Sequence, residues 1–274
     1  FSADWLWQAL ELIEISPKGE YYLTDLVEIA VDQGLHIQTI STDDHSELIG
    51  VNTRVHLAEV TKILQARINR TWMRSGVTMV DPRTTYIEPD VTIAPDTVIL
   101  PNTHLQGQTS IGAECVLGPN TIIRDSQIGD DCEIEASVVE EALLEDDVDI
   151  GPFGHLRRGA HLAEGVHMGN FGEVKASYLG PGTKMGHFSY IGNAEIGQEV
   201  NISAGTITCN YDDEQKHKTK IGDKVFLGSD TMLVAPLTLE DSAQTGAGAV
   251  VTKDVAEKNI VVGVPARAIR VKEE

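Results

Sequence analysis

Basic residues, aromatic residues and cysteine are all scarce in this sequence. Its 274 residues include 21 Lys and Arg against 42 Asp and Glu, which gives a formal net charge of −21, and aromatic residues make up 5%. Nucleic acids and anionic membrane surfaces are recognised through basic patches, so this charge argues against both as partners. No apolar run approaches the roughly 20 residues that a membrane-spanning helix needs.

The three cysteines are Cys115, Cys132 and Cys209, and their spacing fits neither a disulfide framework nor a metal-ligand motif. Such sparse cysteine usage is typical of a reducing compartment. The residues after Phe1 show no charged segment, apolar segment and cleavage site in the order of a signal peptide. We therefore expect a cytoplasmic protein.

A six-residue repeat dominates the rest of the chain. One aliphatic residue recurs at every sixth position, followed by Gly, Ala, Pro or Asp and then by small residues. The series begins near residue 86 and comprises Ile87, Ile93, Ile99, Leu105, Ile111 and Leu117, then Ile150, Leu156, Leu162, Met168 and Val174, then Ile221, Leu227, Leu233, Leu239 and Val251. This period predicts a parallel β-helix in which three hexapeptides close one triangular coil. Residues 86–262 leave room for roughly ten coils at a strand spacing of about 4.8 Å.

The chain before residue 81 lacks this repeat and predicts an α/β segment. Apolar spacing favours a helix over residues 5–12, and Thr24 with Asp25 begins a second helix that ends near Gly34. Alternating residues predict a strand over 36–42. Asn52 is a suitable N-cap for a long helix that ends at Gly76. We expect domains at 1–52 (α/β), 53–80 (helical linker) and 81–274 (β-helix).

Two features of the repeat region carry cationic residues, one within the unbroken repeat and one where it is interrupted. Arg157 and Lys175 are separated by three hexapeptides, so they occupy the same position on adjacent coils and repel each other unless an anion or a carboxylate lies between them. A phosphate would suit this pair, whereas the alternative is two surface cations with Glu173 nearby. The insertion at 210–220 also carries lysines, and it is either a solvated loop or part of a site.

Three histidines at six-residue spacing, His155, His161 and His167, invite comparison with a metal site. One hexapeptide makes one side of the triangle, so these side chains belong to three different faces and cannot converge within one chain. We therefore expect surface histidines and no zinc site.

Longer segments resemble a known family. GPFGHLRRGAHLAEGVHMGNFGEVK, KMGHFSYIGNAEIG and GTITCNYD closely resemble the bifunctional enzymes of bacterial UDP-N-acetylglucosamine synthesis. That family joins a pyrophosphorylase (uridylyltransferase) domain to a left-handed β-helix that is a glucosamine-1-phosphate N-acetyltransferase. GEYYLTD and GVNTR resemble the last segments of the first domain, so residues 1–52 would be the C-terminal remnant of a nucleotidyltransferase domain.

The resemblance implies a role for individual residues. His187 would be the general base on the substrate amine, and Glu173 would orient it. Arg157, Lys175, Tyr190 and Lys216 would hold the sugar phosphate, and Asn201 the sugar. Contacts to acetyl-CoA would come from Ala204, Asn210, Tyr211, Ser229 and Ala247. The family also implies a homotrimer with its sites between subunits.

The resemblance also implies limits. Thr24 matches a sugar-nucleotide contact and Asn52 a magnesium ligand, but the Gly-rich loop, catalytic lysine and metal-binding aspartate of the first domain would precede Phe1. UTP and Mg²⁺ would therefore serve only the full-length parent. A C-terminal arginine that contacts CoA phosphates is not assigned between Arg267 and Arg270. Two alternatives are another hexapeptide acyltransferase, acting on an amino acid or a different sugar, and a non-catalytic trimeric scaffold.

Overall fold

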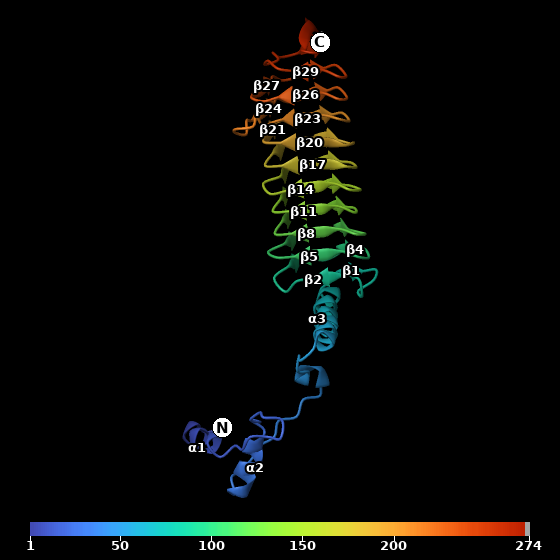
Figure 1. The fold of residues 1–274 in the computed structure, drawn as a ribbon. Helices are drawn as coiled ribbons and strands as arrows, with labels where there is room; N and C mark the ends of the chain where they lie inside the picture. Colours follow the sequence, from blue (N-terminus) through green and yellow to red (C-terminus); the bar gives the residue numbers. More distant parts are fainter. Residues whose placement is uncertain (272–274) are drawn as a thin grey trace. The chain divides into compact units, whose positions relative to one another are not determined.

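The computed structural model describes residues 1–271, which form two compact units (Figure 1). The first unit spans Phe1–Val60, and the second begins at Thr61. The first contains α1 (Ala3–Leu10), α2 (Asp25–Asp32) and the short 3-10 helix η1 (His45–Leu48). Its small core consists of Ala9, Ile13 and Leu26. The three-domain division at 52/53 and 80/81 stays a prediction.

The structure confirms the two short helices and corrects two other expectations. No strand forms over 36–42, and none is described anywhere in residues 1–77, so this segment has no neighbouring strand to complete its backbone hydrogen bonds. Helix α3 (Arg54–Arg74) is capped by Thr53 and not by Asn52, since the Thr53 hydroxyl accepts a hydrogen bond from the His56 amide at 3.1 Å. Gly76, with φ of +100°, follows the helix as expected. None of the described helices is long and apolar enough to cross a bilayer.

The second unit is the predicted left-handed parallel β-helix, with three sheets that we name A, B and C. Sheet A comprises β1 (Thr78–Met79), β4 (Val98–Ile99), β7 (Val116–Leu117), β10 (Glu133–Ile134), β13 (Asp149–Ile150), β16 (His167–Met168), β19 (Lys184–Met185), β22 (Asn201–Ile202), β25 (Phe226–Leu227), β28 (Gln244–Thr245), β30 (Asn259–Val262) and β31 (Arg267–Val271). Sheet B comprises β2 (Tyr86–Ile87), β5 (His104–Gln106), β8 (Ile122–Arg124), β11 (Val138–Glu140), β14 (His155–Arg157), β17 (Gly172–Lys175), β20 (Ser189–Gly192), β23 (Ile207–Cys209), β26 (Met232–Val234) and β29 (Val250–Val251). Sheet C comprises β3 (Thr92–Ile93), β6 (Ser110–Ile111), β9 (Gln127–Ile128), β12 (Leu143–Leu144), β15 (His161–Leu162), β18 (Tyr178–Leu179), β21 (Ala194–Ile196), β24 (Thr219–Ile221) and β27 (Leu237–Leu239).

Every aliphatic residue of the predicted repeat is buried, which confirms that the repeat builds the core. Burial of a side chain of this size stabilises a fold by about 1.5–3 kcal/mol. The small residues of the repeat have a second role, because buried threonine hydroxyls donate to backbone carbonyls of the following coil. Examples are Thr97 to Gly112 at 2.9 Å, Thr121 to Ile134 at 3.1 Å and Thr183 to Gly197 at 2.9 Å. The coils therefore satisfy polar groups at their corners as well as burying apolar ones.

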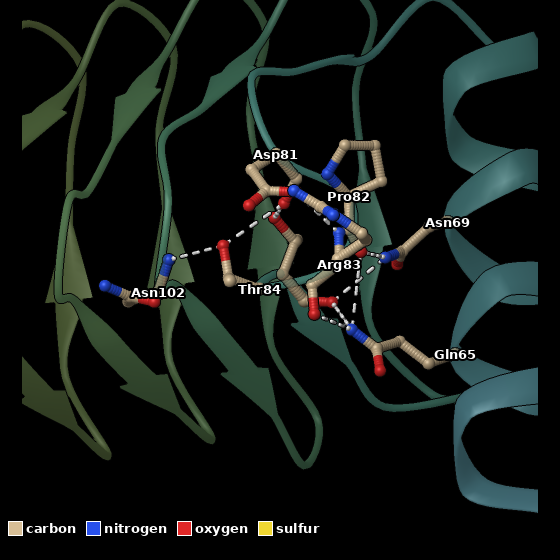
Figure 2. Close-up of polar contacts among 8 residues, drawn as sticks. Gln65, Asn69, Asp81, Pro82, Arg83, Thr84 and Asn102 are labelled. Atoms are coloured by element: carbon tan, nitrogen blue, oxygen red, sulfur yellow. Dashed lines mark hydrogen bonds and ion pairs between the residues drawn. The ribbon is translucent and has the colours of Figure 1, made fainter. Parts of the chain in front are cut away.

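Helix α3 closes the N-terminal end of the core. Ile68 and Trp72 pack against the core, and two amide side chains on the same helix bind the chain that enters the first coil (Figure 2). Asn69 Nδ2 donates to the Pro82 and Thr85 carbonyls at 2.8 and 2.9 Å. Gln65 Nε2 lies 2.7 Å from the same Thr85 carbonyl. The helix end is thus fixed to the coil by hydrogen bonds in addition to apolar contact.

We predict that Asn69→Ala lowers the stability of the β-helix by about 2 kcal/mol, because the half-buried Pro82 carbonyl and the buried Thr85 carbonyl each lose a hydrogen bond from the Asn69 side-chain amide. Asn69 is 1% exposed, so water cannot replace it without a local opening. Thermal unfolding followed by circular dichroism measures the change. Arg70→Ala is the matched control, since Arg70 is the next residue on the same helix and its side chain is exposed. Equal unfolding midpoints for the two variants would contradict the prediction.

Candidate active site

The predicted phosphate-binding cations lie on the outer face of sheet B. Arg157 on β14 is in register with Lys175 on β17, as their spacing of three hexapeptides predicts. Glu173, which precedes Lys175 on the same face of β17, is in register with Tyr190 on β20. Four of the proposed site residues therefore share one face on three successive coils, labelled β14, β17 and β20 in Figure 1.

The electrostatics of this face combine one ion pair with a surplus of positive charge. Arg157 Nη1 donates to Glu173 Oε1 at 2.8 Å, and this hydrogen bond raises the pKa of Arg157. The pKa of Lys175 is lowered, first by the charge of Arg157 and then by that of Lys216. The sequence predicted that either an anion or a carboxylate would lie beside the stacked cations. The Glu173 carboxylate neutralises Arg157, and the repulsion that remains at Lys175 favours the binding of an anion.

A glycine makes room for the tyrosine in this site. Lys175 is in register with Gly192, so no side chain stands above the lysine on the next coil. A Cβ atom at Gly192 would overlap the Tyr190 hydroxyl and crowd the Asn210 amide. The tyrosine hydroxyl therefore lies over Gly192, beside Asn210. This role of Gly192 was not predicted from the sequence. The coil between Lys175 and Gly192 is shorter than three full hexapeptides, so the regular period does not place Gly192 opposite Lys175.

The insertion after β23 is exposed but folded. Asn210 is 6% exposed and donates to Asn193 Oδ1 at 2.7 Å, while its carbonyl accepts from the His217 amide at 2.8 Å. At the tip, Asp212 accepts from the Gln215 and Glu214 amides at 2.8 and 3.0 Å and pairs with the ring of His217. These bonds, above all that from Gln215, hold the pKa of Asp212 far below its usual range. The hairpin returns Lys216 to the side of Lys175.

A second group of proposed residues follows one edge of the β-helix. We name this the AB edge: the turns 186–188, 203–206, 228–231 and 246–249, which lead from sheet A to sheet B. The turns are joined by hydrogen bonds from Gly205 to Phe188, from Asp230 to Ala204 and from Gly248 to Ser229, at 2.7, 2.7 and 2.8 Å. One continuous row therefore contains His187, Ala204, Ser229 and Ala247.

Other proposed residues are not brought into this arrangement within one chain. Asn201 lies on sheet A, in register with Lys184 and Phe226. Asn210 and Tyr211 follow the far end of β23 and not the AB edge. Among the described hydrogen bonds and ion pairs, none joins Glu173 to His187, because the Glu173 carboxylate binds Arg157. The orienting role of Glu173 stays a prediction.

Thr24 and Asn52 belong to the first unit. Thr24 precedes α2, and its side chain makes no capping hydrogen bond. Asn52 is exposed, and its backbone N–H donates a hydrogen bond to His56 Nδ1 at 3.3 Å. Residues 1–271 contain no group of three or more His, Cys, Asp or Glu side chains that could hold a metal ion. The nucleotide and magnesium roles of Thr24 and Asn52 stay predictions.

The histidines at six-residue spacing lie on three sheets, as predicted: His155 on B, His161 on C and His167 on A. Each one also pairs with a carboxylate of the preceding coil, which was not predicted from the sequence. These pairs are His155 with Glu140, His161 with Glu145 and His167 with Asp149. Acidic residues about one coil earlier in the sequence are the signal that could have identified them.

Comparisons with known proteins identify the repeats and the relatives of this chain. Residues 90–125 match the family described as bacterial transferase hexapeptide (six repeats), and residues 218–253 match the hexapeptide repeat of succinyl-transferase. The bifunctional protein GlmU of Streptococcus agalactiae serotype V is 46% identical over 259 residues, which is 94% of this chain and 56% of that protein. The GlmU of Lactococcus lactis subsp. cremoris (strain MG1363) is 50% identical over the same length, with 57% of it covered.

The chain is a relative of GlmU. It spans about half the length of the curated GlmU proteins that it matches, and the hexapeptide matches fall in its β-helix. Among solved structures, LpxA from Acinetobacter baumannii aligns with 69% of this chain and 72% of its own, at 20% identity and a TM-score of 0.44. The resemblance to the GlmU family stated from the sequence is therefore confirmed.

We predict that Asp212→Asn loosens the hairpin and reduces the hydrogen-exchange protection of its tip amides severalfold at pH 7. A carboxyl whose native pKa is depressed stabilises the fold above its unfolded pKa, which is about 4, and this contribution is lost as the pH falls through the native value. The wild type should therefore keep its protection down to about pH 4 and lose it only below. Asp213→Asn is the control, because Asp213 accepts a hydrogen bond from Tyr211 through its backbone carbonyl. Unchanged protection in Asp212→Asn at pH 7 would contradict the assignment.

Proposed function

We propose that this chain transfers an acetyl group from acetyl-CoA to the amine of glucosamine-1-phosphate, giving N-acetylglucosamine-1-phosphate for UDP-N-acetylglucosamine synthesis. The observation that carries the proposal is the gathering of Arg157, Lys175 and Lys216 beside Tyr190 in a strongly acidic chain. Three cations on one face, with their charges incompletely neutralised, favour a phosphorylated acceptor over an amino acid or a free sugar.

The chemistry assigned to His187 needs no covalent intermediate on the protein. A neutral imidazole, with a reference pKa of about 6.5, accepts a proton from an amine as that amine attacks the thioester. Cys209 is not used as a nucleophile, because burial raises the pKa of its thiol and so disfavours the thiolate. The role of His187 as the general base rests on its place on the AB edge and on the resemblance to GlmU.

The AB edge is the proposed site for acetyl-CoA. Ala204, Ser229 and Ala247 have short side chains in one row above His187, which leaves this edge open to an extended pantetheine arm. Asn210 and Tyr211 lie elsewhere on the chain, and a homotrimer in which a neighbouring subunit supplies them would complete the site. This homotrimer is part of the proposal, as is its place in the cytoplasm. UTP and Mg²⁺ are assigned to the additional length of the GlmU relatives.

We predict that Arg157→Ala or Lys175→Ala raises the KM for glucosamine-1-phosphate about tenfold or more and changes the KM for acetyl-CoA by less than about twofold. A hydrogen bond to a charged group contributes about 1.5–3 kcal/mol, and the phosphate would lose one. Steady-state kinetics of thiol release measures both constants. Arg158→Ala is the matched control, since Arg158 is the next residue but pairs with Glu141. Equal weakening of both substrates would show that the two cations do not bind the phosphate.

We predict that His187→Ala lowers kcat by about 10²–10⁴-fold and leaves both KM values nearly unchanged, because a general base acts in the transition state. The control is His161→Ala on sheet C, away from the AB edge. If the His187 variant kept more than about half of its activity at neutral pH, another group would be the base.

A further inference from the structure

One histidine pair on the β-helix differs from the others in the ring nitrogen that it uses. Among residues 1–271, His155, His161 and His217 each present Nε2 to a carboxylate. His167 instead presents Nδ1 to Asp149 Oδ2. An ionised carboxylate only accepts hydrogen bonds, so the ring nitrogen that faces it carries the proton. In neutral His167 this leaves Nε2 as a free acceptor, the tautomer that a carboxylate fixes in proton-transferring histidines.

The free nitrogen points toward the turn that contains His187. His167 Nε2 lies 3.7 Å from the position of a Cβ atom on Gly186, and no other atom beyond the chain neighbours of Gly186 approaches that position within 4 Å. Gly186 directly precedes His187, so the absence of a side chain exposes His167 to this turn. The His167 side chain is 45% exposed and therefore also reaches water.

The charged groups around His167 are those of neighbouring sheet A strands and of the AB edge. Asp149 lies one coil before it and Lys184 one coil after it, both in register. Glu133 is in register with Asp149, one coil further away. His187 is the titratable group of the adjacent turn. The ring therefore lies between a carboxylate at hydrogen-bond distance on one coil and a lysine in register on the next.

Acetylation of an amino sugar requires two proton transfers. An amine with a pKa of about 8 is mostly an ammonium at neutral pH and cannot attack a thioester. The full reaction is R–NH₃⁺ + CH₃CO–S–CoA → R–NH–COCH₃ + HS–CoA + H⁺: two N–H bonds and the C–S bond break, and one C–N and one S–H bond form. One proton ends on sulfur and the other in water. A single imidazole holds only one of these protons at a time.

We propose that the Asp149–His167 pair is a second proton-transfer element of the site. His167 Nε2 receives the ammonium proton from His187 and releases it to water, which leaves His187 neutral when the amine attacks. Asp149 is a positioning residue that fixes the tautomer of His167. This inference rests on the proposed acetyl transfer.

The test compares His167→Gln with His161→Gln across pH, using thiol release from acetyl-CoA with glucosamine-1-phosphate. We expect His167→Gln to lose at least about tenfold in kcat at pH 6.5, where the ammonium dominates, and less than about twofold at pH 9, where the free amine does. His161→Gln should stay within about twofold of the wild type at both values. Added imidazole should restore part of the lost rate at pH 6.5. A deficit of the same size at both pH values would show a structural role and overturn the inference.

Two further measurements separate a failure of this inference from a failure of the proposed acetyl transfer. Nitrogen-15 NMR of the histidine rings reports the tautomer of His167 without any assay, and a proton on Nε2 in the neutral ring would overturn the inference. Asp149→Asn should reproduce the pH-dependent loss in weaker form, which serves as the test if His167→Gln does not fold. A wild-type chain that does not acetylate glucosamine-1-phosphate contradicts the proposed function. An active wild type with no pH-dependent loss in either variant contradicts this inference alone.

Discussion

The distance between coils determines what each outward-facing side chain can do. Successive strands of a sheet lie about 4.8 Å apart, and parallel register places equivalent residues directly above one another. Parallel register fixes the backbone positions of Arg157 and Lys175 in this way. Glu173 neutralises the arginine, yet the pKa of Lys175 remains lowered by its neighbours. Unrelieved repulsion between these cations is the physical basis of the anion site that we propose on this face.

The same register combines three local features into one surface. The columns of sheet B supply the cations, the AB edge supplies a row of small residues with His187, and the hairpin after β23 returns Lys216 to the cations. Each feature is assembled from short segments, and each acquires its position only because the coils beneath it are stacked and closed. Helix α3 contributes by covering the first coil, so the core of the solenoid is not exposed at that end.

Much of the fold and part of the site could be predicted from the sequence, because a strict period converts sequence distance into spatial distance. The buried aliphatic residues and the register of Arg157 with Lys175 both follow from counting. Where the period changes, counting fails: Val138 pairs with His155, and Glu133 with Asp149, across coils that are shorter than three full hexapeptides. The pairs His155–Glu140 and His161–Glu145 and the position of Tyr190 over Gly192 were missed for this reason. Asp149 lies a full 18 residues before His167, so this pair follows from the period and was overlooked. In the first unit, local patterns predicted a strand over 36–42 that has no partner, and placed the helix cap on Asn52, directly before Thr53.

The most direct measurement is thiol release from acetyl-CoA by the purified chain with a panel of acceptors: glucosamine-1-phosphate, glucosamine-6-phosphate, glucosamine and serine. The account predicts the highest kcat/KM for glucosamine-1-phosphate, with free glucosamine at least about tenfold lower because it lacks the charged group that the cations bind. Equal rates with glucosamine and glucosamine-1-phosphate, or a preference for serine, would contradict it.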